Sequence, residues 1–189
     1  MKKFAILAVA IGFLIPAAQA EAFLGDVQIY FVNQDIEIGA ASDDDNGFGV
    51  RGRLFFTENF FGTARFQRVS FDGFDSDDLR VGGGWAFRVS PEVTPYVKVE
   101  YIDLGSDLDQ DGFGVTGGVD WSVTPQFILR GEVGYIDLDD IDGFELTAGG
   151  TFMFTPTLGA FAEVRWWDAS VNGLDVEITD IRAGVTFNF

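Results

Sequence analysis

A repeat of about 32 residues is the feature that most constrains the fold of this chain. Five segments align without gaps: VRGRLFFTE from Val50, VGGGWAFRV from Val81, VTGGVDWSV from Val115, LTAGGTFMF from Leu146 and IRAGVTFNF from Ile181. Because one structural unit recurs along the chain, the unit has to be interpreted before any single motif.

Apolar residues alternate with polar or small ones in every segment. This period of two is the signature of a β-strand whose two faces meet different surroundings. One face of the second segment is Val81, Gly83, Trp85 and Phe87, all apolar or small. Partner strands of the same kind are predicted at 25–39, 61–67, 96–104, 129–138 and 158–169. Each repeat is therefore predicted to be a β-hairpin.

Two kinds of connection join these strands. One kind is short, and it contains all four prolines that follow residue 20: Pro91, Pro95, Pro125 and Pro156. Proline suits turns because its fixed φ starts them and it cannot sit inside a paired strand. The other kind is acidic and carries glycine or asparagine: ASDDDNG, DGFDSDD, GSDLDQDG, LDDIDG and SVNGLDV. We expect the proline turns at one end of the sheet and the acidic loops at the other.

One acidic connection contains half of a calcium-binding pattern. Asp107, Asp109 and Asp111 alternate ahead of a glycine, as in the first half of an EF-hand loop. The twelfth position, where a bidentate glutamate should close the site, is Gly118, and no helical period flanks the loop. The segment is therefore interpreted as one of five similar acidic loops.

The composition of the polar face indicates which side of the sheet meets solvent. A water-exposed face should be rich in charge and poor in glycine, whereas this face is rich in glycine and sets arginine beside glutamate. Aromatic residues also recur near both ends of the apolar face. Such belts are typical of a transmembrane β-barrel, in which strands of about nine to eleven residues cross the hydrocarbon. We predict an all-β, closed antiparallel transmembrane barrel of ten strands, with eight as the alternative.

The N-terminus has the pattern of a cleaved signal peptide. Lys2 and Lys3 precede an apolar run that ends at Ile15, and Ala18-Gln19-Ala20 matches a cleavage site. Residues 1–20 are predicted to be removed, leaving one barrel domain at 21–189. Without the two lysines, the formal charge of −18 becomes −20, which disfavours binding to nucleic acid. There is no cysteine, so disulfides cannot stabilise the fold.

These features resemble the small outer-membrane β-barrel proteins of Gram-negative bacteria, similar to the OmpA-type and OmpX-type barrels. The resemblance covers the whole of 21–189 and departs from the best-known small members, which have eight strands. It implies export through the periplasm to the outer membrane. It also implies contact with outer-membrane lipid and lipopolysaccharide, and with periplasmic chaperones and the barrel-assembly machinery during biogenesis. By resemblance, that machinery reads a C-terminal signal at Ile181, Val185, Phe187 and Phe189.

The sequence excludes the commonest catalytic arrangements. The chain has no histidine, so it lacks the usual base of hydrolases at neutral pH. We predict a non-enzymatic barrel without a cofactor and with a structural role in the cell envelope. The alternatives are a narrow porin-like channel and a surface adhesin or ligand-binding barrel that uses the acidic loops.

Charges on the inward face and acids near the loops are the candidate site residues. The inward charges are expected to form ion pairs across the lumen, with a narrow pore as the alternative; they are Arg51, Arg53, Arg65, Lys98, Glu100, Arg130, Glu132, Glu163 and Arg165. No firm metal site is predicted. A further hypothesis is that loosely bound Ca²⁺ or Mg²⁺ bridges loop carboxylates to lipid phosphates; the candidates are Asp103, Asp107, Asp109, Asp111, Asp137 and Asp168.

Overall fold

The computed structural model describes residues 25–39, 41–71, 74–106, 110–171 and 174–189. It contains ten β-strands: β1 (Gly25–Ile38), β2 (Ala41–Phe55), β3 (Phe60–Phe71), β4 (Phe74–Ala86), β5 (Val93–Ser106), β6 (Gln110–Thr124), β7 (Phe127–Leu138), β8 (Ile141–Met153), β9 (Leu158–Val171) and β10 (Leu174–Asn188). No helix in this part of the chain is long and apolar enough to cross a membrane. The predicted signal peptide, 1–20, lies outside the described residues.

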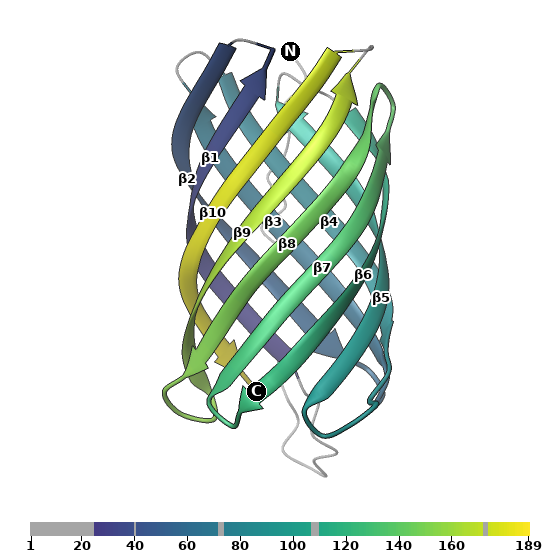
Figure 1. Ribbon diagram of the computed structural model, residues 1–189, viewed down its shortest axis with the longest axis vertical. Coiled ribbons are helices and arrows are strands. Elements are labelled where there is room, and N and C mark those ends of the chain that lie inside the picture. The colour runs from purple at the N-terminus through teal and green to yellow at the C-terminus, as the bar shows by residue number, and fades with distance from the viewer. Residues whose placement is uncertain (1–24, 40, 72–73, 107–109, 172–173) are drawn as a thin grey trace, which may run out of the picture.

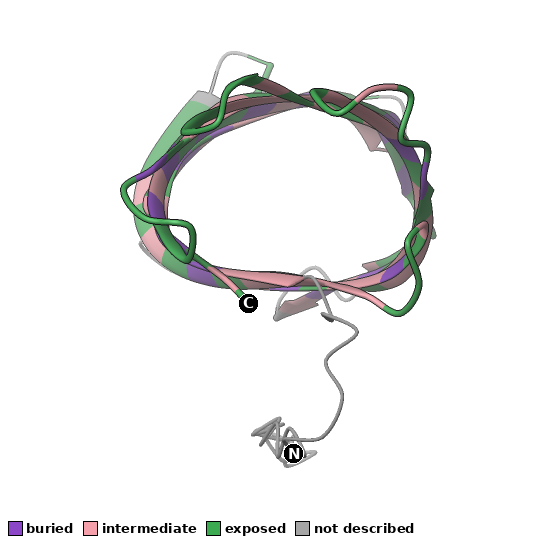
Figure 2. Cartoon of the chain, turned by 90° about the horizontal axis from the view of Figure 1, so that it is seen from below, coloured by how far each residue is buried: buried purple, intermediate pink, exposed green. Residues whose placement is uncertain are grey.

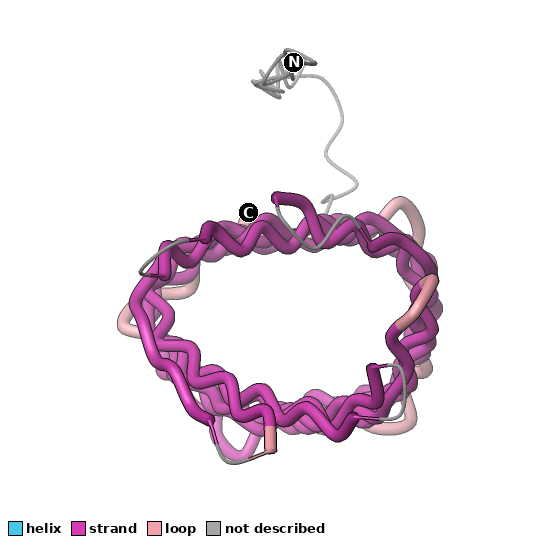
Figure 3. Tube along the Cα trace, turned by 90° about the horizontal axis from the view of Figure 1, so that it is seen from above, coloured by secondary structure: helices cyan, strands magenta, loops and turns pink. Residues whose placement is uncertain are grey.

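The strands form one closed antiparallel barrel in which each strand pairs with its neighbours in sequence and β10 pairs with β1 (Figure 1). At this seam the backbones of Gly25 and Phe189 exchange two hydrogen bonds, with N···O distances of 2.9 and 3.0 Å. Seen along its axis, the ring of strands is oval (Figure 3). The closed ten-stranded barrel predicted from the sequence is confirmed, and the eight-stranded alternative is wrong.

The outward face is the apolar face of the sequence pattern. Two belts of exposed aromatic side chains ring it, as the alternation predicts. One belt lies towards the proline turns and contains Phe56, Phe87, Trp121, Phe152 and Phe187; the other lies towards the acidic connections and contains Tyr101 and Tyr135, with half-buried Trp166. Aromatic rings prefer the headgroup level of a bilayer, so the belts mark the two faces of the membrane. Figure 2 views the proline-turn end, where most of the connecting turns are exposed.

The strands are longer than the sequence analysis expected. They have 12 to 15 residues, and most of the acidic segments expected to be loops belong to strands. Asp43, Asp44 and Asp45, for example, continue β2 and pair with β1. Pro95 was also expected in a turn, but it is the third residue of β5 and faces Val119 of β6. It has no N–H to donate, and its carbonyl accepts the Phe87 amide at 2.7 Å.

The extension is possible because the two faces of the barrel exchange polarity beyond the upper aromatic belt. In β5 the inward face changes from Lys98 and Glu100 to buried Ile102 and Leu104, while Asp103 points outward. β7 repeats the change with Ile136, Leu138 and outward Asp137. An apolar inside and an acidic outside are what a strand needs in water. The ladder therefore continues past the membrane level, with an apolar core inside it.

Candidate functional site

Charged side chains fill the lumen at the level of the membrane. All nine inward charges expected from the sequence lie there, buried or half-buried. A ten-stranded ring is somewhat wider than the eight-stranded ring that ordinary side chains fill, and long arginines can span the difference. The described lumen holds seven more charged residues that the sequence analysis did not include among its site residues: Asp26, Asp78, Arg80, Asp120, Glu145, Asp180 and Arg182.

One ion-pair network crosses the barrel between β4 on one side and β8 and β9 on the other. Arg80 of β4 donates to Glu145 of β8 through Nη2 at 2.8 Å, and Arg165 of β9 reaches both Glu145 at 3.1 Å and Asp78 of β4 at 3.4 Å. Arg65 of β3 binds the same Asp78 at 2.6 Å. All five side chains are at least nine-tenths buried, so these contacts exclude water from the middle of the lumen.

The network continues along β9 and β10 to the side of β2. Asp180, which is fully buried, accepts hydrogen bonds from Arg182 at 2.6 Å and from Gln34 at 2.7 Å. It also forms an ion pair with Arg165, whose Nε lies 2.8 Å away. Arg182 also reaches Glu163 at 3.1 Å, and Arg51 binds Glu163 through both terminal nitrogens at 2.6 and 2.7 Å. Paired, charge-assisted hydrogen bonds of this kind offset the large cost of burying single charges.

A second group of charges lies nearer the proline turns. Arg53 of β2 reaches across the ring to Asp120 of β6 at 2.8 Å, and Arg130 of β7 binds the same carboxylate at 2.7 Å. On the neighbouring wall, Lys98 contacts Glu100 at 3.0 Å and Glu132 at 3.5 Å.

The lumen charges are thus paired, and many of the pairs join different strands. Arg130 and Glu132 alternate along one strand, as do Glu163 and Arg165, but these neighbours are not the partners. In the structure Arg130 pairs with Asp120, and Glu163 pairs with Arg51 and Arg182. Charges two apart on a strand point the same way, whereas guanidinium groups extend across the ring to carboxylates on other strands.

Two apolar clusters also lie inside the barrel, one above the charges towards the acidic end and one partly beside them, where the Arg51 guanidinium lies over the Phe161 ring. One cluster joins β5, β7, β8 and β9 and contains Ile102, Leu104, Ile136, Leu138, Ile141, Trp167 and Ala169, with Val171 and Ile178 packed against it. A second cluster joins β1, β3 and β9 and contains Tyr30, Val32, Val69, Phe71 and Phe161, with Ile36 packed against it. Neither cluster was predicted from the sequence, although the inward residues of the Tyr-Ile-Asp-Leu segments at 101–104 and 135–138 indicate the first one.

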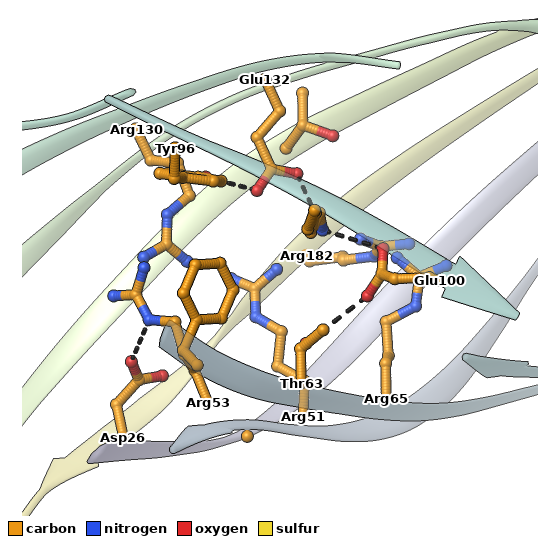
Figure 4. Close-up of a pocket in the computed structure, with 14 residues that line it drawn as sticks. Asp26, Arg51, Arg53, Thr63, Arg65, Tyr96, Glu100, Arg130, Glu132 and Arg182 are labelled. Atoms are coloured by element: carbon orange, nitrogen blue, oxygen red, sulfur yellow. Dashed lines mark hydrogen bonds and ion pairs between the residues drawn. The ribbon is translucent and has the colours of Figure 1, made fainter. Parts of the chain in front are cut away.

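Below the charges, a small vestibule lies on the proline-turn side of the lumen (Figure 4). Its volume is about 50 Å³, which is room for a few water molecules. Phe61 and Tyr96 form an apolar part of its wall, and their rings meet edge to face at 6.0 Å. The charged residues of the lining are six cations and three acids: Arg51, Arg53, Arg65, Lys98, Arg130, Arg182, Asp26, Glu100 and Glu132.

Outward carboxylates face one another in pairs at the acidic end. Each of four hairpins sets two acids directly opposite: Asp35 and Asp44, Asp103 and Asp111, Asp137 and Asp142, and Asp168 and Glu177. In the hairpin of β3 and β4, Arg68 and Asp77 form an ion pair at the corresponding position. Among the described residues, no group of three or more acids could hold a metal ion. Asp107 and Asp109 lie outside the described residues.

The belts, the closed ring and the filled lumen define a transmembrane β-barrel protein. Residues 5–189 match the family described as outer membrane protein beta-barrel domain, and the chain belongs to this family. No curated protein matches the chain at the level of sequence.

Solved structures with the same fold are only distantly similar in sequence. An outer membrane channel from Pseudomonas putida F1 is 9% identical, with a TM-score of 0.57 over 90% of this chain and 97% of that one. Neisserial surface protein A is 15% identical, with a TM-score of 0.46 over 87% and 97%. The attachment invasion locus protein Ail of Yersinia pestis is also 15% identical, with a TM-score of 0.43 over 87% and 99%. At these identities, the likeness concerns the fold alone.

Proposed function

We propose that this protein is a non-conducting barrel with a structural role in the outer membrane. The observation that carries the proposal is the filled lumen. Arg80, Arg165 and Arg53 each reach carboxylates on distant strands, and buried apolar clusters lie above and beside these charges. An ion would have to break paired, buried charges and then cross an apolar layer, and both steps carry a large desolvation cost.

The family resemblance supports the proposed location and partners. The chain would reach the outer membrane through the periplasm with the help of chaperones and the barrel-assembly machinery, and would keep its proline turns on the periplasmic side. Ile181, Val185, Phe187 and Phe189 all lie exposed at the β10 edge of the seam, where an assembly factor would find them before closure. We propose no catalytic role and no cofactor for catalysis, because the chain has no histidine.

Single-channel recording in planar bilayers tests the structural role. We expect no discrete conductance steps from barrels whose insertion is verified by their heat-dependent mobility shift. The double variant Arg53→Ser with Asp120→Ser removes the lower cross-lumen pair and should remain silent, because the apolar clusters are intact. Discrete steps from the wild-type barrel would instead support the narrow-channel alternative.

The opposed acids favour a second candidate role, divalent-cation bridging to lipopolysaccharide. Like charges directly opposite on paired strands destabilise the hairpin, and this arrangement recurs in four of the five hairpins. Ca²⁺ or Mg²⁺ between two carboxylates would relieve the repulsion and leave coordination positions for water and lipid phosphate. Asp103, Asp111, Asp137 and Asp168 would take part. Each pair supplies two ligands only, so binding would be loose.

Thermal unfolding in lipopolysaccharide-containing membranes tests this role. A chelator should lower the melting temperature of the wild-type barrel. It should have a smaller effect on the double variant Asp103→Asn with Asp111→Asn, which no longer needs a cation at that hairpin. Glu58→Gln with Glu92→Gln, at the proline turns, removes the same charge and serves as the control. If chelator leaves the wild-type melting temperature unchanged, the bridging role is wrong.

A further inference from the structure

We infer that the vestibule below the ion-pair networks binds a small oxyanion, a phosphate or a carboxylate group. The chain as a whole is strongly acidic, with 30 acids and 12 basic residues. The vestibule reverses this balance, because twice as many cations as acids line it. Arginine forks match the geometry of phosphate and carboxylate groups.

Some of the acids that neutralise the lining cations lie behind them and do not line the vestibule. Glu163 and Asp78, which pair with Arg51 and Arg65, have side chains only 3% and 8% exposed, and neither lines the vestibule. Arg53 and Arg130 have side chains 21% exposed and do line it. A molecule in the vestibule therefore meets guanidinium groups more than carboxylates, although the lumen as a whole is balanced.

Arg65 supplies a hydrogen-bond donor without a partner. Its Nη2 donates to Asp78, but its Nε is buried and has no hydrogen-bond partner among the described residues. A buried guanidinium donor without a partner is costly, and Arg65 itself lines the vestibule. A small movement of its side chain would turn this Nε, which water does not reach in the unliganded barrel, towards an oxyanion in the vestibule. Asp78 keeps Arg80 and Arg165 as partners, so Arg65 is not needed to neutralise that carboxylate.

The size of the vestibule limits the ligand. At about 50 Å³ the vestibule has room for a few water molecules. A phosphate ion, or the carboxylate group of a small molecule, could replace them. A sugar ring or a chain of sugars is too large. The vestibule is therefore inferred to hold a bound ion, and this binding does not require that the barrel transports anything. The inference is thus independent of the proposed structural role.

Titration calorimetry with inorganic phosphate tests the site in the folded barrel, held in maltoside micelles that contain no phosphate group. Ionic strength is kept constant throughout. We expect saturable binding by the wild-type barrel. Arg65→Gln should weaken it by about tenfold or more, the value of one charge-assisted hydrogen bond. Glu132→Gln removes an acid from the lining and should tighten binding several-fold, because Lys98 keeps Glu100 and glutamine can still accept from Tyr96.

Arg88→Gln is the matched control, since it removes one cation from an exposed position near the proline turns. The affinity of this variant for inorganic phosphate should equal that of the wild-type barrel. The proposal is overturned if no saturable binding occurs, or if Glu132→Gln does not bind more tightly. It is also overturned if phosphatidylglycerol added to the micelles stabilises the barrel and inorganic phosphate does not, because the anion would then be a lipid headgroup outside the lumen. Neither result depends on whether the barrel conducts.

Discussion

Three inward glycines show how single residues shape the barrel wall. Gly47, Gly112 and Gly143 lie in the repeated pattern Asn/Asp-Gly-Phe, at the level where the faces exchange polarity. A Cβ on each would lie 2.0 to 2.1 Å from a backbone carbonyl oxygen of the neighbouring strand, that of Arg68, Asp137 or Asp168. No real Cβ comes so close to backbone, so glycine is needed for the strands to approach there.

Alanine substitution should therefore destabilise the barrel at these inward glycines but not at an outward glycine with free space around it. We expect Gly143→Ala to lower the free energy of unfolding by about 1–3 kcal/mol, because the backbone of β9 has to move. Gly117→Ala is the control: nothing lies within 4 Å of its added Cβ, so stability should stay within about 1 kcal/mol of wild type or rise. Denaturant unfolding of the refolded barrel in lipid vesicles measures both. Equal losses for the two variants would contradict a role for close strand approach.

The strand is the scale at which the membrane position is set. Along β5 and β7, inward and outward faces exchange polarity after Tyr101 and Tyr135. The same change occurs in β9 after Trp166, where inward Trp167 is 3% exposed and outward Asp168 is exposed. Each of these three strands thus has a membrane part with a charged inside and an upper part with an apolar inside. The aromatic belt marks the boundary between the two.

Two neighbouring tryptophans offer a direct measurement of this boundary. Single-tryptophan variants that keep only Trp166 or only Trp167, with the others changed to phenylalanine, should respond oppositely to brominated lipids. Trp166 faces the acyl chains and should be quenched, whereas Trp167 belongs to the apolar cluster inside the barrel and should keep its fluorescence. Strong quenching of Trp167 would mean that β9 is turned the other way. The variant retaining only Trp121, in the lower belt, is the positive control.

Charge is distributed unevenly over the whole molecule. Eight of the ten cations after residue 20 lie in the described lumen and are paired there with eight acids. Arg68 and Arg88 are the two cations outside it. The large negative charge therefore belongs to the two ends of the barrel, above all to the acidic end, while the membrane part is close to neutral inside. Such a division keeps the cost of buried charge low in the membrane.

Much of this architecture was predictable from local sequence. The period of two assigned inward and outward residues correctly, because successive side chains of a strand point to opposite faces wherever the strand lies. The repeat predicted ten strands, and the aromatic belts predicted a membrane environment. The upper apolar core was also predictable, because Ile102 and Leu104 continue the inward face of Lys98 and Glu100. It was not predicted because these segments were assigned to loops on the basis of their acidic composition.

Two properties could be read from the amino-acid sequence alone: which residues face inward, and that the chain closes into a membrane barrel. Both follow from patterns within single hairpins. Which charges meet depends instead on how distant strands are placed in the closed ring. Arg53 pairs with Asp120 four strands away around the ring, and Arg165 pairs with Asp78 on the opposite wall. These contacts depend on the stagger and oval shape of the closed ring, which no local pattern encodes. The vestibule and its surplus of cations follow from the same geometry.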